Sequence, residues 1–285
     1  MLKVGLIDHH LDNFHTNIFL DLFKNELKDE KIVFACAYES DAANQEKDWC
    51  AENGVARCES IAEVIEKSDA LMVLAPDNID DHLELGKEAC ASGKRVYIDK
   101  YLSNSYADAK ELLDICAANG TEMISSSSLR FCDGVEKIAA DLEAEPTWMY
   151  ARGPGSWPWY ACHTLAPVLR LMGDQVERVI HTGSEDNITV TLRYRDGRSA
   201  VIEVNDAENM WEGFDWEFKV KVNNQIVTFK PGDHRIFYGN MMKEAAKFFK
   251  TGETCITPSM LEMESWLYQA VADSLKNGNE WVCRD

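Results

Sequence analysis

The sequence predicts an α/β fold: a doubly wound parallel sheet followed by an α+β domain whose sheet is mostly antiparallel. Three observations support this class. Short apolar runs alternate with helical patterns through the first half of the chain. Several runs, such as residues 71–74, are continuously apolar, which is typical of strands covered on both faces. After residue 128 the strand patterns lengthen and alternate with period two. We therefore place the domains at residues 1–128 and 129–285.

The first domain is expected to contain five clear strands and one weaker strand, with helical patterns between them. The strands are predicted at 3–7, 32–37, 70–75, 95–99 and 122–126, with the weaker one near 55–58. The helices are predicted at 14–23, 61–66, 81–91 and 106–119. Gly93 and Gly120 follow helices and suit their C-terminal ends. We expect Asp12 to cap the helix that begins near Phe14, and Asp80 to cap the helix that carries His82 in its first turn.

The second domain is expected to begin with a helix at 134–142 and to continue as a set of strands. The strands are predicted at 147–152, 175–182, 187–193, 199–206, 217–222 and 225–230. Asp196-Gly197 and Asn223-Asn224 are typical of hairpin turns. Two helices, 238–249 and 258–276, end the domain.

Composition excludes several classes of function. The 285 residues include 49 Asp and Glu against 29 Lys and Arg, giving a formal charge of -20. Such a field repels nucleic acid and anionic lipid, so we expect neither as a partner. There is no apolar run long enough to span a bilayer and no secretory pattern at the N-terminus. Nine scattered cysteines with no CxxC pair indicate reduced thiols in a cytoplasmic protein.

Two features point to a functional site. Lys100 directly follows the predicted strand 95–99, and ligands in doubly wound folds bind at the carboxyl ends of strands. The first strand runs into Asp8-His9-His10-Leu11-Asp12-Asn13, where a dinucleotide-binding protein carries a glycine-rich turn. An account of function must explain both the lysine and the missing glycines.

The chain resembles the Gfo/Idh/MocA oxidoreductases, and the resemblance covers nearly its whole length. It rests on stretches that occur in the family's order: residues 68–76 with His82; Asp99-Lys100-Tyr101 in place of Glu-Lys-Pro; Leu129-Arg130-Phe131; the histidine segment from Cys162-His163 to Gly173; and a closing two-helix tail. The resemblance implies a Rossmann-like nucleotide-binding domain followed by a substrate and oligomerisation domain. It also implies a homo-oligomer, either a dimer or a tetramer.

The resemblance further implies an NAD- or NADP-dependent dehydrogenase acting on a small molecule, expected to be a sugar or polyol hydroxyl. Lys100 would hold the reacting hydroxyl and His163 would exchange its proton, which makes these two the expected catalytic residues. The expected cofactor-binding residues lie at strand ends: Ile7, His9, His10, Tyr38, Ala75, Pro76 and Asp99. The expected substrate-binding residues are Lys100, Arg130, Trp157, Trp159 and His163.

The chain departs from the family pattern at several of these positions. Asp8, His10 and Asn13 stand where the three glycines are expected. A carboxylate about 4 Å from a phosphate costs on the order of 4 kcal/mol at an effective dielectric of about 20. Ala37 stands at the usual position of the acid that binds the ribose, although Glu39 follows closely. These departures are expected to weaken dinucleotide binding.

Other functions stay open on the sequence alone. A protein of this fold without a dinucleotide would bind a sugar-like ligand or a partner, or act as a cofactor-independent lyase or isomerase. Trp157 and Trp159 suit a carbohydrate wall and a subunit contact equally well. Three histidines lie in the 8–15 segment, but alternation along a strand would point His9 and His10 to opposite sides. We assign no metal ligands, and whether the loop binds a metal is left open.

Overall fold

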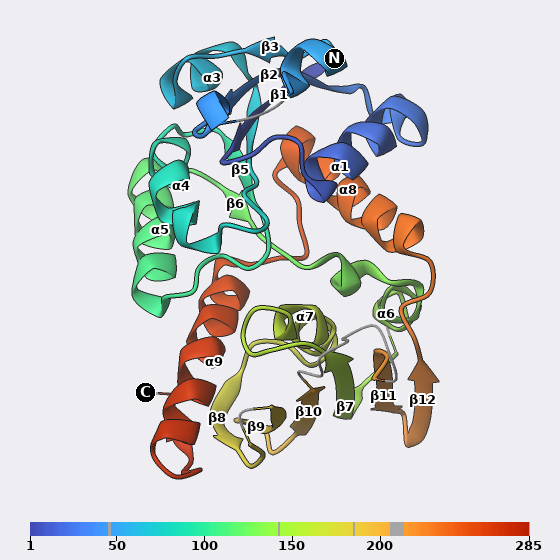
Figure 1. Ribbon diagram of the computed structural model, residues 1–285. Helices are drawn as coiled ribbons and strands as arrows, with labels where there is room; N and C mark the ends of the chain where they lie inside the picture. Colours follow the sequence, from blue (N-terminus) through green and yellow to red (C-terminus); the bar gives the residue numbers. More distant parts are fainter. Residues whose placement is uncertain (45–46, 142, 185, 206–213, 285) are drawn as a thin grey trace. The chain divides into compact units, whose positions relative to one another are not determined.

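The computed structural model describes residues 1–44, 47–141, 143–184, 186–205 and 214–284. The chain divides into two compact units. The first unit comprises Met1–Ser126 and Gly239–Leu261, and the second comprises Ser127–Tyr238 and Glu262–Asp285. Each unit has its own sheet (Figure 1).

The first unit contains a six-stranded, wholly parallel sheet in the order β3-β2-β1-β4-β5-β6. Its strands are β1 (Leu2–Asp8), β2 (Ile32–Glu39), β3 (Ala56–Arg57), β4 (Ala70–Val73), β5 (Arg95–Ile98) and β6 (Met123–Ile124). Its helices are α1 (Phe14–Asn25), α2 (Trp49–Asn53), α3 (Ile61–Lys67), α4 (His82–Cys90) and α5 (Tyr106–Asn119). Three 3-10 turns lie at Lys28–Glu30, Ala42–Asn44 and Ile79–Asp81. Figure 1 shows α1 on one side of the sheet and α4 and α5 on the other, as the doubly wound prediction requires.

Two predicted helix caps are wrong. Asn13, not Asp12, caps α1, because its side chain accepts the amide proton of Thr16 at 2.9 Å. Asp12 instead accepts a hydrogen bond from the side chain of Asn17. Asp81, not Asp80, precedes α4, and its side chain makes no capping bond. Both errors are of one residue, where several adjacent Asp and Asn residues offer equivalent cap chemistry.

Close packing of β1 against α3 explains a glycine in the first strand. A Cβ atom at Gly5 would lie 2.2 Å from Ser68 Oγ and 2.4 Å from Val64 Cγ1. The Ser68 hydroxyl is fixed in turn, because it donates to the Val64 carbonyl at 2.7 Å. The close contact between β1 and α3 sets the position of the carboxyl end of β1 relative to that helix.

The second unit contains a seven-stranded sheet in the order β12-β11-β7-β10-β9-β8-β13. Its strands are β7 (Pro146–Pro154), β8 (Val176–His181), β9 (Asn187–Tyr194), β10 (Ser199–Asn205), β11 (Glu217–Val222), β12 (Gln225–Phe229) and β13 (Val282–Cys283). The pair β7 and β10 is parallel and the other pairs are antiparallel, which confirms the mostly antiparallel prediction. Leu142 and Asp206, which end a predicted helix and a predicted strand, lie outside the described residues.

Helix α7 (Ala161–Met172) packs on β7 and β10 and is almost entirely buried. A 3-10 turn (Ser128–Phe131) and α6 (Asp133–Ala139) precede it in the chain. Two long helices, α8 (His234–Thr251) and α9 (Pro258–Lys276), each contain residues of both units. Among the described residues, no helix is both long and apolar enough to cross a membrane.

Candidate functional site

The carboxyl ends of β1, β2, β4 and β5 lie on one edge of the first unit's sheet, because these strands are parallel neighbours. The predicted cofactor residues therefore gather there, together with Lys100. Direct contacts join three of the strand ends: Leu74 N donates to Ile7 O at 2.9 Å, and Lys100 Nζ donates to Pro76 O at 3.3 Å. Topology alone thus confirms that these positions are neighbours; their role toward a ligand stays a prediction.

Asp8 is the buried centre of this edge, with none of its surface exposed. Its Oδ1 accepts the backbone N–H of Ala75 at 3.0 Å and of His10 at 3.2 Å. Its Oδ2 accepts from Asn13 Nδ2 at 2.9 Å and from Thr16 Oγ1 at 3.1 Å. Burial raises the pKa of Asp8 to about 7 against the opposing effect of these hydrogen bonds.

Glu39, at the end of β2, accepts a hydrogen bond from the backbone of another residue in the same loop. It is buried, and its Oε1 accepts the amide proton of Leu11 at 2.7 Å, while Oε2 receives a hydrogen bond from Arg57 at 3.1 Å. Two backbone bonds also tie the loops after β1 and β2: Ser40 N to Asp8 O at 2.9 Å and Asp41 N to His9 O at 3.3 Å. The loop in place of a glycine-rich turn is therefore held by carboxylates from within the chain.

Asp99 forms the centre of a second buried network, at the end of β5. His15 Nδ1, from α1, lies 2.5 Å from Asp99 Oδ2. Asp99 Oδ1 accepts from Lys100 N at 2.8 Å and from Tyr97 OH at 3.2 Å. Burial alone would raise the pKa of Asp99, but the charge and hydrogen bond of His15 and the charge of Lys100 lower it below its usual value. The carboxylate holds Lys100 through its backbone, and so positions that side chain.

Lys100 and His82 connect the ends of β4 and β5. Lys100 is 8% exposed, and its ammonium group donates to the Pro76 carbonyl. His82 is fully buried: Nε2 lies 2.8 Å from Leu74 O, and Nδ1 lies 3.1 Å from Tyr101 O. Burial lowers the pKa of His82, so the ring tends to be neutral. A neutral imidazole carries one N–H, so the ring lies against the loops after β4 and β5 but donates to a carbonyl of only one of them.

His163 lies on α7 in the second unit and is 7% exposed. Its Nδ1 lies 2.7 Å from Ser127 Oγ. The Tyr160 ring stands edge-on to it at 4.7 Å, and the Trp216 ring lies at 6.0 Å. In the tautomer that donates from Nδ1 to Ser127, Nε2 carries a lone pair that can accept a proton. Burial raises the pKa of Tyr160 to about 12, which keeps that neighbour neutral.

The other predicted substrate residues have different surroundings in the second unit. Arg130 is fully buried and its guanidinium lies 3.7 Å from Glu264, a carboxyl that also accepts from Tyr268 OH at 2.6 Å. Burial raises the pKa of Glu264, and Arg130 opposes that rise. Trp157 Nε1 donates to the Tyr268 carbonyl at 3.2 Å, whereas the Trp159 side chain is 43% exposed.

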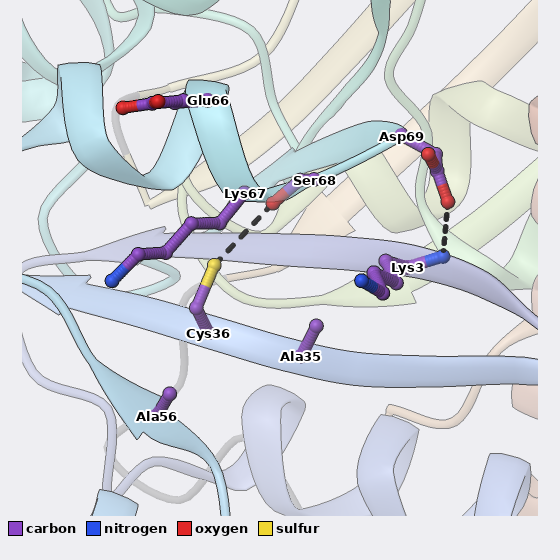
Figure 2. A pocket seen from close by; sticks show the side chains of 8 residues that line it. All are labelled: Lys3, Ala35, Cys36, Ala56, Glu66, Lys67, Ser68 and Asp69. Carbon is purple, nitrogen blue, oxygen red and sulfur yellow. Dashed lines mark hydrogen bonds between the residues drawn. The ribbon is translucent and has the colours of Figure 1, made fainter.

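A hollow of about 490 Å³ lies elsewhere on the first unit. Figure 2 shows that it is lined by Lys3 on β1, Cys36 on β2 and Ser68 and Asp69 after α3, with a hydrogen bond from Lys3 N to Asp69. Lys3 and Asp69 lie near the amino ends of β1 and β4. Because ligands of doubly wound folds bind at the opposite, carboxyl edge, we do not place the site in this hollow.

Sequence reasoning missed three groups that organise these sites. Ser127 holds His163, His15 holds Asp99, and Thr16 donates to Asp8. The run of four serines at 125–128 and the histidine-rich segment after β1 were the available signals. Neither signal shows which distant partner each side chain meets.

Comparison with known proteins agrees with the fold. Residues 12–126 match a family described as "Oxidoreductase family, NAD-binding Rossmann fold", the Gfo/Idh/MocA family. An uncharacterized oxidoreductase from Streptococcus pneumoniae serotype 4 is 24% identical over 199 residues, which cover 57% of this chain and 54% of that protein. The matched region thus spans about half the length of this curated relative. The predicted resemblance to these oxidoreductases is confirmed.

Solved structures of similar fold cover nearly the whole chain. A probable dehydrogenase from Thermotoga maritima superposes with a TM-score of 0.81 at 18% identity, covering 99% of this chain and 98% of that one. An apo scyllo-inositol dehydrogenase from Lactobacillus casei gives 0.77 at 13% identity, covering 99% and 98%. An Agrobacterium radiobacter oxidoreductase in complex with NAD+, L-tartaric acid and magnesium gives 0.76 at 15%, covering 99% and 98%. At these identities the likeness shows the fold alone.

The loop after β1 does not fit a dinucleotide held in the usual way. In Rossmann folds the pyrophosphate accepts backbone N–H groups at the strand-to-helix turn. Here the N–H of His10 is donated to Asp8, that of Leu11 to Glu39, and that of Thr16 to Asn13. A pyrophosphate would have to displace the carboxyl groups of Asp8 and Glu39 and the amide oxygen of Asn13 from these donors. We therefore route no chemical step through a dinucleotide at this loop.

Proposed function

We propose that the chain is an oxidoreductase that acts on a hydroxyl group of a sugar or polyol. The observation that carries the chemistry is the buried His163, whose Nδ1 is held by Ser127 at 2.7 Å. Oxidation of an alcohol carbon requires loss of the hydroxyl proton, and an imidazole fixed at one nitrogen can accept that proton at the other. The family match supports the oxidoreductase class, and the inositol dehydrogenase among the similar folds is the reason for proposing this substrate class.

Lys100 is the second residue to which we assign a role. Its ammonium group is mostly withdrawn from water, and its backbone is fixed by Asp99. A lysine so placed can donate a hydrogen bond to a hydroxyl oxygen and stabilise negative charge that develops on it. We assign it the role of holding the substrate oxygen, and His163 the role of exchanging the proton.

The redox partner that we propose is NAD or NADP, as in the family. It binds weakly, because the N–H groups of the loop after β1 already have intramolecular acceptors. One displaced carboxylate at about 4 Å costs on the order of 4 kcal/mol, or about a thousandfold in affinity. We therefore expect dissociation constants in the millimolar range.

A second candidate function is favoured by the same loop after β1, whose N–H groups already donate to carboxyl groups of the chain. In it the chain binds a sugar-like ligand or a partner without a dinucleotide, or acts as a cofactor-independent lyase or isomerase. Both candidates allow a homo-oligomer, for which the exposed Ile226 and Val227 on the edge strand β12 are the expected contacts.

Turnover at millimolar nucleotide separates the candidates. We would incubate the protein with NAD or NADP and a panel of inositols and sugars, and follow nicotinamide reduction by absorbance. Turnover that is lost in Lys100→Ala and in His163→Gln supports the oxidoreductase. A ligand that raises the unfolding temperature without any nucleotide-dependent turnover supports the second candidate; at 100 times its dissociation constant such a ligand adds about 2.7 kcal/mol.

A further inference from the structure

A cluster of two histidines and an aspartate lies at the carboxyl edge of the first unit's sheet. One ligand atom each from His9, His10 and Asp41 lies within 4.8 Å of the others. The two imidazole rings are 4.2 Å apart between centroids, with planes tilted by 59°. The expectation that His9 and His10 point to opposite sides is wrong, because β1 ends at Asp8 and the alternation of a strand does not extend to them.

The separation of these atoms is close to that of a metal site. Ligands about 2.0–2.1 Å from a tetrahedral ion lie roughly 3.4 Å from one another. The cluster therefore needs to contract by about 1.4 Å at most, which side-chain rotation on an unchanged backbone can supply. Water or a ligand oxygen would take the position that three protein ligands leave open.

The backbone under the cluster is fixed. Asp41 N donates to His9 O at 3.3 Å, and Ser40 N donates to Asp8 O at 2.9 Å. Buried Glu39 also accepts the amide proton of Leu11. These bonds hold the loop that carries the histidines against the loop that carries Asp41, so the three side chains stay together without an ion.

The surroundings of His9 match those of a metal-bound imidazole. Its Nδ1 lies 2.8 Å from Ser40 Oγ and 3.6 Å from Asp81 Oδ2. A histidine that donates from Nδ1 to such partners presents the lone pair of Nε2, and metal-bound histidines usually have an outer hydrogen-bond partner of this kind. The cluster thus contains both ligands and the groups that orient one of them.

Charge and access also favour a cation. The His9, His10 and Asp41 side chains are 26%, 39% and 26% exposed, so an ion can enter from solvent. Asp41 Oδ2 lies 3.8 Å from His10 Nδ1, and the chain carries a formal charge of -20. Where a dinucleotide-binding loop offers N–H groups to an anion, this loop presents imidazole and carboxylate groups.

We propose that His9, His10 and Asp41 bind a divalent transition-metal ion, with Ser40 and Asp81 orienting His9. Two imidazoles and one carboxylate suit Zn²⁺, Co²⁺ or Ni²⁺ better than Mg²⁺ or Ca²⁺, which prefer oxygen ligands. The site needs neither a dinucleotide nor turnover, so it stands or falls separately from the proposed oxidoreductase.

Calorimetric titration with Zn²⁺ tests the site. The full chain would be used without a histidine tag, reduced, and with Cys283→Ser to remove an exposed thiol. We expect one equivalent of zinc, bound at least tenfold more weakly in His10→Gln and in Asp41→Asn. Ser40→Ala removes an orienting partner only and should weaken binding about 10–100-fold. Mg²⁺ should bind far more weakly than Zn²⁺.

His234→Gln is the matched control, because His234 also lies beside an aspartate, 3.6 Å from Asp233, but belongs to no such three-residue cluster among the described residues. It should leave the zinc affinity unchanged. Circular dichroism and unfolding temperature of the zinc-free variants verify that each is folded. Zinc binding of equal strength in the parent, His10→Gln and Asp41→Asn would overturn the proposal, and so would the absence of a stoichiometric site in the parent.

Discussion

The buried pair of His15 and Asp99 gives the sharpest prediction about stability. The side chains are 8% and 0% exposed, and Nδ1 and Oδ2 are 2.5 Å apart. His15→Ala leaves the Asp99 carboxylate in the interior with Tyr97 OH and Lys100 N as its remaining described donors. The substitution therefore tests the cost of an uncompensated buried charge.

The magnitude follows from the burial of both partners. Breaking a buried, hydrogen-bonded pair by removing one partner typically costs about 3–5 kcal/mol. We expect His15→Ala to lower the free energy of unfolding by that amount. His15→Gln, which keeps a donor without the charge, should lose less.

Urea unfolding followed by tryptophan fluorescence measures this loss. The cycle of His15→Ala, Asp99→Asn and the double variant isolates the pair, and we expect the double variant to be more stable than the sum of the single losses predicts. His234→Ala, at an exposed histidine, should change stability by less than about 0.5 kcal/mol. A loss below about 1 kcal/mol in His15→Ala, or strict additivity in the cycle, would refute the reasoning.

The same pair predicts a direction for the pH dependence. The folded-state pKa of Asp99 lies below its unfolded value of 3.8, since His15 and Lys100 outweigh burial. The unfolded chain therefore binds the proton more readily, and the contribution of Asp99 is present above about pH 4. It should be lost as pH falls through the folded pKa. Asp99→Asn should flatten that acid limb of the stability profile.

The remaining predictions concern the site and the packing beneath it. His163→Gln should lower kcat about 10²–10⁴-fold, as expected for loss of a proton acceptor, while His181→Gln, at a buried histidine of the same unit, should retain turnover. Ser127→Ala should give a smaller loss of kcat, because it removes the hydroxyl partner of His163 Nδ1. Gly5→Ala should lower the free energy of unfolding in urea by about 1–3 kcal/mol, since its Cβ would lie 2.2 Å from Ser68 Oγ. Ser68→Ala in the same chain should restore part of that loss. An unchanged unfolding midpoint in Gly5→Ala would contradict this packing. Arg130→Ala should cost about 3–5 kcal/mol by leaving buried Glu264 with the Tyr268 hydroxyl as its remaining partner among the described residues, and Glu264→Gln should restore part of it.

The fold could be predicted because its signals are local. Continuous apolar runs and intervening helical patterns fixed the parallel sheet, and α5 (Tyr106–Asn119) has the predicted limits. The five-residue α2 (Trp49–Asn53) was missed, since a single turn is too short for a periodic signal. The strand predicted at 70–75 ends at Val73, because Ala75 turns the chain at a φ of 47°.

The sites could be predicted only in part, because their contacts join distant residues. Parallel topology predicted that Ala75, Pro76, Asp99 and Lys100 meet at one edge. The burial of Asp8 could not be inferred, because the residue whose N–H it accepts, Ala75, lies 67 positions away in the sequence. The partnership of His15 with Asp99 spans 84 positions and that of Ser127 with His163 spans 36. The sequence shows that these polar side chains are present, but it does not show which of them form hydrogen bonds with one another.

The central claim is that carboxyl groups of the chain itself accept the backbone N–H groups that a pyrophosphate needs. Calorimetric titration with NAD, of the parent and of Asp8→Gly, tests this most directly. We predict a dissociation constant in the millimolar range for the parent and at least tenfold tighter binding for the variant, whose His10 and Ala75 N–H groups are released. Micromolar binding by the parent, unchanged in Asp8→Gly, would contradict that occupation.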